Sequence, residues 1–150
     1  MDAVEATARA SVQKTLSDYI RYVDTGRAEL LAGLFTEETE YAMAPGIVAH
    51  RRDEIVPKVE ELKTLFATTA EYGRLRHHLA LPMVDILGPG QARAFTYFSA
   101  VAAAGLDHWG TYRDQLVEID GEWRFQSRII TLEGAIDTSP VRQHVPAQAR

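Results

Sequence analysis

Apolar residues in the first half of the chain recur at the spacing of amphipathic helices. The repeat predicts a helix over residues 4–23, a short second helix over 30–35 and a third helix over 53–68. Pro57 fits the third helix because proline is tolerated in a first turn. Between the second and third helices, residues 40–44 have the composition of a brief strand.

The second half of the chain changes to a pattern of β-branched and aromatic residues that is typical of strands. The expected strands cover residues 75–87, 92–103, 108–119 and 122–132. The segments Gly88-Pro89-Gly90 and Asp120-Gly121 separate successive strands, and the second is a strong hairpin signal. Helices followed by hairpin-connected strands predict an α+β fold with an antiparallel sheet.

Composition adds the expectation of one globular domain. The chain has 150 residues, of which 46% are hydrophobic and 25% charged, and its formal net charge is −5. We expect a single domain over 1–135 and a small, polar C-terminal tail over 136–150 that runs over the surface. The lack of cysteine excludes disulfides and thiolate chemistry, and the acidic balance argues against nucleic-acid binding. No signal peptide or membrane span is visible, which predicts a cytoplasmic protein.

The candidate chemistry centres on His77 and Asp24. A carboxylate that holds an imidazole makes a general base without a metal or coenzyme, and no metal-ligand spacing is present, so we expect no cofactor. His77 and His78 are strand neighbours that point to opposite faces, and His77 shares its face with Leu79 and Leu81. The alternative for His77 is a buried, hydrogen-bonded structural histidine. Asp24 has two interpretations. The first is an N-cap of the second helix. The second is a site residue, because Asp24 lies at the C-terminus of the first helix, where a carboxylate needs a compensating partner.

The order of elements and four short features together resemble the SnoaL-like domain of the nuclear-transport-factor-2-like superfamily. These features are the position of Asp24, Arg76-His77-His78, Gly110-Thr111-Tyr112-Arg113-Asp114 and Ile119-Asp120-Gly121-Glu122-Trp123-Arg124-Phe125. The resemblance spans roughly residues 5–133. It implies a cone-shaped α+β barrel whose N-terminal helices pack in the concave face of a curved antiparallel sheet.

In site chemistry the chain is most similar to the scytalone dehydratase and hexachlorocyclohexane dehydrochlorinase members of that superfamily. Carried over by position, the resemblance implies an Asp24–His77 dyad and places the arginine of the dehydrochlorinase at Arg128. Two positions depart from the pattern. Leu81 stands where many relatives have asparagine, and the second histidine of the dehydratase would fall near Ala102. The resemblance therefore implies the dyad rather than either complete site.

Arg128 has two possible placements. Strict alternation sets it opposite Trp123 and Phe125, on a face that could be solvated, whereas a β-bulge between 123 and 128 would turn it inward. Inside, its guanidinium would stabilise a leaving group or an oxyanion. Tyr112 is a candidate donor to a substrate oxygen, or else a half-buried core residue. The candidate substrate contacts are Tyr19, Tyr22, Phe98, Trp109 and His108, with core packing as the alternative for the aromatic rings.

The function expected from these residues is that of a lyase, a dehydratase or related elimination enzyme, acting on a small, largely apolar ring compound. His77 would take a proton from carbon while Asp24 holds the imidazole in one tautomer. An isomerase or polyketide cyclase is one alternative, and a noncatalytic ligand carrier or dioxygenase small subunit is another. Phe95, Tyr97 and Val101 alternate along one strand face, which predicts a homodimer or homotrimer.

Overall fold

The computed structural model describes residues 1–43, 47–67 and 75–146. Its helices are α1 (Ala3–Thr25), α2 (Ala28–Ala32) and α3 (Ile55–Ala67). The carboxylate of Asp2 caps α1 by accepting the Glu5 backbone N–H at 2.8 Å. Gly26 ends the same helix with φ 69°, a left-handed conformation that glycine adopts readily. The expected apolar stripe of α1 is buried, including Val12, Leu16 and Tyr19.

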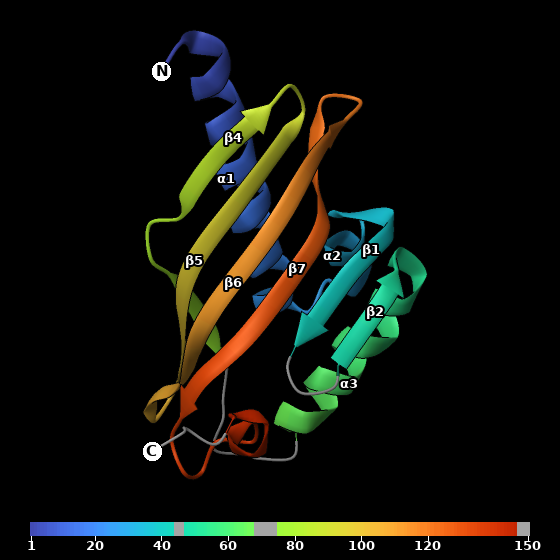
Figure 1. Cartoon of the computed structure of the whole chain (residues 1–150). Coiled ribbons are helices and arrows are strands. Elements are labelled where there is room, and N and C mark those ends of the chain that lie inside the picture. The colour runs from blue at the N-terminus through green and yellow to red at the C-terminus, as the bar shows by residue number, and fades with distance from the viewer. Residues whose placement is uncertain (44–46, 68–74, 147–150) are drawn as a thin grey trace.

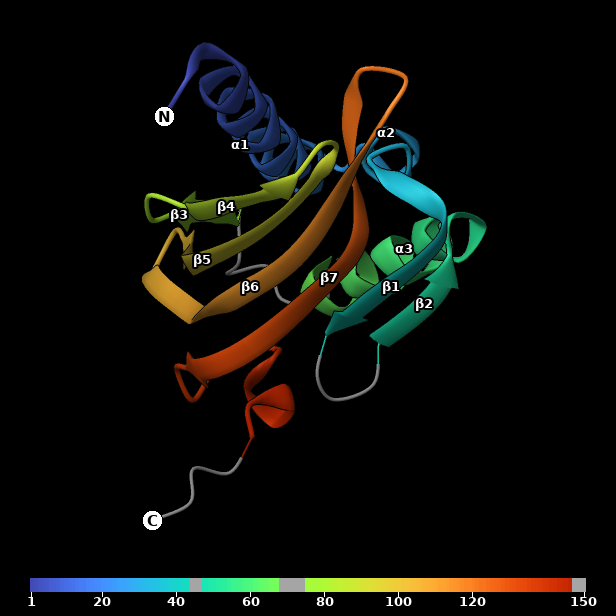
Figure 2. The ribbon, with the colours of Figure 1, turned by 45° about the horizontal axis from the view of Figure 1, so that its top comes forward.

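Seven strands form one curved sheet that does not close on itself (Figure 1). They are β1 (Phe35–Met43), β2 (Ile47–Arg51), β3 (Arg76–Leu79), β4 (Met83–Gly88), β5 (Gln91–Ala102), β6 (Gly105–Ile119) and β7 (Glu122–Ala135). Their order is β2-β1-β7-β6-β5-β3, with β4 also paired to β5. The helices lie along the concave side of the sheet, α1 across β4 to β7 and α3 behind β1 and β2 (Figure 2). The α+β prediction is confirmed.

Three local differences separate the structure from the expected elements. The segment expected as one strand over 75–87 is two strands, and Leu81 lies between them with 86% of its surface exposed, so it cannot wall a cavity. β2 was not expected, and β1 pairs with β7 in parallel rather than antiparallel fashion. Positions 44 and 68, the last residues of an expected strand and helix, lie outside the described residues.

The segment after β7 also differs from expectation. Residues 136–146 were expected to run over the surface, but Val141 is 1% exposed and joins the hydrophobic core. The short 3-10 helix at Arg142–His144 lies beside the lower end of β7 (Figure 1). Burial of Val141 supplies the apolar contact that holds this segment in place. The division of the chain into a domain over 1–135 and a tail stays a prediction.

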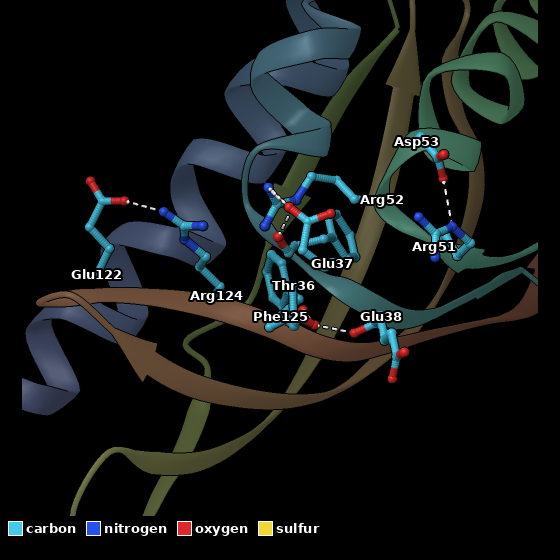
Figure 3. Close-up of polar contacts among 10 residues, drawn as sticks. Thr36, Glu37, Glu38, Arg51, Arg52, Asp53, Glu122, Arg124 and Phe125 are labelled. Atoms are coloured by element: carbon cyan, nitrogen blue, oxygen red, sulfur yellow. Dashed lines mark hydrogen bonds and ion pairs between the residues drawn. The ribbon is translucent and has the colours of Figure 1, made fainter.

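Polar contacts fix the start of α3 against the sheet (Figure 3). Arg52 donates through Nε to the Phe35 carbonyl oxygen at 2.8 Å, and its Nη1 lies 2.7 Å from a carboxylate oxygen of Glu37. The carboxylate of Glu54 accepts the His50 backbone N–H at 2.7 Å. These contacts join the turn before α3 to β1 and β2.

Large apolar side chains remain on the outer face of the sheet. Tyr97 on β5 is 53% exposed, and Met83 on the neighbouring β4 is also 53% exposed. Trp109 on β6 adds a ring that is 37% exposed. Exposed apolar surface of this kind is typical of contacts between protein chains, and the expected homo-oligomer stays a prediction.

Candidate active site

A cavity of about 330 Å³ lies between α1, α3 and the concave face of the sheet. Its most buried lining residues, each at most 4% exposed, are Tyr19, Tyr41, Phe98, His108, Tyr112, Ile130, Leu132 and Val141. Asp24, His77 and two partly exposed cations, Lys63 and Arg76, also line it. The volume is at the lower end of the range for small-molecule sites. The cavity therefore combines a buried aromatic wall with ionisable groups.

The structure brings Asp24 and His77 together inside this cavity. Asp24 lies in the last turn of α1 and His77 lies in β3, and the carboxylate oxygen is 2.8 Å from Nδ1 of the imidazole. The same carboxylate accepts the backbone N–H of His77 at 3.2 and 3.4 Å. Because an ionised carboxylate only accepts, the ring proton belongs on Nδ1, and Nε2 carries the lone pair. Both side chains are 12% exposed, so water screens the pair only weakly.

The carboxylate of Asp24 stands at the negative end of the α1 dipole, where it needs compensation. His77 supplies part of it through the two N–H donors. Arg76 adds a cation whose Nη1 donates to the Asp24 carbonyl oxygen at 3.3 Å. Lys63 reaches from α3 and donates to the Gly26 carbonyl oxygen at 3.0 Å. α1 has no basic residue in its own last turn, so α3 and β3 provide the charges that complete this helix end.

A second imidazole, from β6, lies close to the imidazole of His77. The ring of His108 on β6 is 5.8 Å from the ring of His77, measured between centroids. Nδ1 of His108 is 2.6 Å from a carboxylate oxygen of Asp107. Burial lowers the pKa of His108, the Asp107 carboxylate acts to raise it, and the nearby His77 lowers it further. The sequence has no histidine near Ala102, where the resemblance would place a second one, but His108 on β6 brings a second imidazole into the cavity.

Aromatic rings complete the wall behind the two histidines. Phe98 stacks on Tyr112 with 4.4 Å between centroids and lies 6.0 Å from the His77 ring. The hydroxyls of Tyr19 and Tyr41 are hydrogen-bonded to each other at 2.9 Å. Burial raises the pKa of Tyr112 and of Tyr41 well above the usual value, and raises that of Tyr19. These phenols therefore stay protonated at neutral pH, and Tyr112 is able to donate a hydrogen bond.

Arg128 is turned inward by a β-bulge, as one of its two expected placements required. Gln115 pairs with Ser127 while Leu116 pairs with Phe125, so Gln126 is an extra residue on β7. Arg128 does not line the cavity, however, and the role of a direct leaving-group contact is corrected. It is 0% exposed and makes two 2.7 Å hydrogen bonds to Asp114.

The guanidinium of Arg128 lies behind the aromatic wall. Its central carbon is 3.9 Å from the Tyr19 ring centroid, 4.2 Å from that of Phe125 and 4.5 Å from that of Tyr112. Cation–π contacts of this kind are attractive and hold the rings in place. Arg128 thus supports two tyrosines that do line the cavity.

Two expected substrate contacts lie away from the cavity. Trp109 follows His108 on β6, so its side chain points to the outer face, where it covers Gly134. A Cβ on Gly134 would meet the Trp109 ring at 2.0 Å, which explains the glycine. Tyr22 packs partly buried against the core and is not among the lining residues, because Tyr19 and Val23 occupy the inward face of α1. The roles expected for Trp109 and Tyr22 are corrected accordingly.

Residues that sequence reasoning missed are Tyr41, Asp107 and Ser139. Tyr41 gave no signal beyond its place in a short strand. Asp107 was overlooked because neighbours on a regular strand point to opposite faces.

Within the described ranges no three His, Asp or Glu side chains converge in an arrangement that could hold a metal ion. No helix of the described part of the chain has the length and apolarity to cross a bilayer.

Comparisons with known proteins agree with this architecture. A family model described as a SnoaL-like domain matches residues 4–129. A candidate scytalone dehydratase from Novosphingobium aromaticivorans has a TM-score of 0.80 and 22% identity, covering 100% of this chain and 99% of that chain. ActVI-ORFA from Streptomyces coelicolor has a TM-score of 0.70 and 24% identity, covering 85% of this chain and 98% of that chain.

The β subunit of a candidate aromatic-ring-hydroxylating dioxygenase from Novosphingobium aromaticivorans has the same fold. Its TM-score is 0.68 with 18% identity, covering 86% of this chain and 91% of that chain. A search of curated proteins gave no match. At these identities the likenesses establish the fold, and one fold of this kind serves several functions.

Proposed function

The chain belongs to the SnoaL-like domain family, and from that premise we propose that it is a cofactor-independent lyase. The reaction is a dehydration or related elimination on a small, largely apolar ring compound. The observation that carries the proposal is the 2.8 Å contact between Asp24 and His77 inside the cavity. A noncatalytic carrier has no need of a carboxylate-supported imidazole beside its ligand, whereas proton abstraction requires a base, and this imidazole can serve as one.

His77 is the general base. Asp24 accepts a hydrogen bond from Nδ1–H and stabilises the imidazolium that forms when Nε2 takes a proton from a substrate carbon. Neither role needs a conformational change, because the backbone N–H of His77 already fixes the carboxylate. The partial burial of the pair strengthens the electrostatic stabilisation of the imidazolium.

The leaving group requires a proton donor on the other side of the substrate. In the dehydration, the C–H bond breaks as His77 takes the proton, and its electrons form the new double bond. The C–O bond breaks, and the departing oxygen takes a proton from Nε2 of His108 and leaves as water, in the minority of molecules in which His108 is charged at neutral pH, because burial lowers the pKa of His108. The proton on His77 then returns to solvent, and His108 is recharged from solvent. Tyr112 donates a hydrogen bond to a substrate oxygen, a role that its protonated phenol supports.

The cavity lining supports a ring compound as substrate. Phe98 and Tyr112 present a stacked aromatic surface beside His77, and Leu132 and Val141 add aliphatic walls. Within a volume of about 330 Å³, only a small molecule fits. Arg128 contributes indirectly, by supporting Tyr19 and Tyr112 from behind.

The test is incubation of the protein with a panel of hydroxylated aromatic compounds and hydroxylated cyclic ketones, with product masses recorded. Loss of one water from a panel member supports the lyase. The proposal fails if the protein binds ring compounds in the panel and converts none of them. A control with the His77→Gln variant separates enzymatic turnover from spontaneous elimination, because that variant keeps a polar side chain but loses the base.

The second candidate is an isomerase or cyclase of the same fold. The observation that favours it is the pair of imidazoles 5.8 Å apart, since one can remove a proton from carbon and the other can return a proton elsewhere on the same molecule. Product mass separates the two reactions, because isomerisation leaves the mass unchanged. A noncatalytic subunit, the third candidate, predicts ligand binding without any conversion.

A further inference from the structure

Asp107 and His108 are sequence neighbours whose side chains both point into the protein, although neighbours on a regular strand point to opposite faces. The cause is a β-bulge. Ala100 pairs with His108 while Val101 pairs with Leu106, so Asp107 is an extra residue on β6. Asp107 is 0% exposed and His108 is 4% exposed. Bulges re-aim side chains near sites of function, and this one sets a carboxylate against an imidazole.

The carboxylate of Asp107 also holds the C-terminal segment. Its Oδ2 is 2.6 Å from Nδ1 of His108 and accepts the Ser139 hydroxyl at 2.8 Å. The Asp107 carbonyl oxygen accepts the Ile136 backbone N–H at 2.9 Å. The Ser139 hydroxyl oxygen in turn accepts the Val141 backbone N–H at 3.3 Å. A chain of hydrogen bonds therefore runs from the His108 imidazole to Val141, which lines the cavity.

The other carboxylate oxygen of Asp107 has no hydrogen-bond partner among the described residues. A buried acceptor without a partner lowers stability, and few are found in native proteins. A side chain selected only to hold the C-terminal segment would not need to be a carboxylate, because an amide or hydroxyl can accept from Ser139 as well. We therefore infer that the carboxylate of Asp107 acts on the imidazole of His108, to which it is hydrogen-bonded.

We propose that Asp107 and Ser139 are positioning residues that hold His108 with its ring proton on Nδ1 and make the segment from Ile136 to Val141 a built part of the site. The proposal rests on the proposed function in one respect, that His108 exchanges a proton with the substrate through Nε2. The groups that act on His108 electrostatically include Asp107 on its own strand and His77 on β3. Ser139 orients the carboxylate so that Oδ2, rather than Oδ1, faces the ring.

The experiment is two-dimensional ¹H–¹⁵N NMR of the imidazole rings in the free, full-length protein, which separates protonated from unprotonated ring nitrogens. A His108→Gln variant assigns the signals. In the wild-type protein, above the pH at which His108 loses its second proton, we expect the Nδ1–H tautomer as the major form. The Nε2–H tautomer as the major form would overturn the proposal without any further variant.

Asp107→Asn tests the source of that preference. An amide can rotate to offer an N–H to Nδ1, so we expect loss of the Nδ1–H tautomer as the major form. Asp137→Asn is the matched control, because its carboxylate lies on the same segment but is fully exposed, and it leaves His108 unchanged. An Asp107→Asn protein that is folded and keeps the wild-type tautomer and pH titration of His108 would contradict the proposal.

Ser139→Ala keeps the carboxylate and tests the segment, even where Asp107→Asn fails to fold. We expect a shift of the His108 ring signals and faster hydrogen exchange of the Val141 amide, whose acceptor is removed. Unchanged ring signals and unchanged exchange would overturn the role of Ser139. These readouts need no substrate, so they stand if no compound is converted, a result that would instead defeat the proposed function.

Discussion

Replacement of Arg128 by methionine removes a buried cation while it keeps most of the apolar stem. Arg128 is 0% exposed and Asp114 is 3% exposed, and two 2.7 Å hydrogen bonds join them. Breaking a buried pair by removing one partner costs about 3–5 kcal/mol of unfolding free energy, because the remaining charge is buried without compensation. The loss of the contact with the Tyr19 ring adds a further ~1 kcal/mol.

Equilibrium urea denaturation followed by circular dichroism measures this effect. With an m value of about 2 kcal/mol/M, a total loss of about 4–6 kcal/mol lowers the midpoint by roughly 2–3 M. The double variant Arg128→Met with Asp114→Leu removes both charges and fills the space with apolar atoms. We therefore expect it to be more stable than the Arg128→Met single variant, because replacing a whole buried pair with apolar residues is often close to neutral.

Arg93→Met is the matched control, because the Arg93–Asp85 pair lies on the surface with side chains 65% and 58% exposed. An exposed pair contributes about 0–1 kcal/mol, so the midpoint changes little. The reasoning is refuted if Arg128→Met lowers the unfolding free energy by less than about 1 kcal/mol, or if the effects of the two buried substitutions are additive.

Three further predictions concern packing and pH. Gly110→Ala places a Cβ 1.9 Å from the Thr131 carbonyl oxygen and should cost about 1–3 kcal/mol or more in urea denaturation, whereas Gly88→Ala, with open space, is the control. Burial raises the pKa of Tyr19, Tyr41 and Tyr112, so the unfolded chain loses these protons first and stability falls as pH rises above about 10; a phenolate absorbance rise from these residues before unfolding would contradict this. Burial lowers the pKa of His108, so the unfolded chain binds its proton more readily and stability falls as pH drops below about 6.5; a His108→Gln variant should lose part of that slope in thermal melts between about pH 6.5 and 5.

The periodicity of the sequence was enough to place the helices and most strands, because the buried face of each element follows its own repeat. α1 and α3 lie within a few residues of the expected ranges, and the hairpin at Asp120-Gly121 has both residues at positive φ. β2 and its neighbour β1 were harder, because the parallel pairing of β1 with β7 depends on contacts distant in sequence. Long-range pairing leaves no local signal.

The residues of the candidate site likewise fall into those that local sequence signals predicted and those that they did not. The Asp24–His77 contact could be predicted because a carboxylate at a helix C-terminus needs a compensating partner and because the family resemblance pairs these two positions. Both arguments use residues that can be identified in the sequence. Asp107 and Arg128 depended on β-bulges, which shift every later side chain by one position. A bulge near Arg128 was among the alternatives, but nothing in the residue pattern marked one at Asp107. Val141 was missed because a small, polar segment gave no periodic signal of burial.

We propose above all that His77 is a base supported by Asp24 in the cavity. The most direct test compares turnover by His77→Gln with turnover by His78→Gln, on a substrate identified from the panel. His78 is the adjacent, exposed imidazole on the other face of β3, so its loss should leave turnover unchanged. We predict that His77→Gln lowers kcat about 10²–10⁴-fold with the fold retained. Wild-type turnover by His77→Gln would contradict the account.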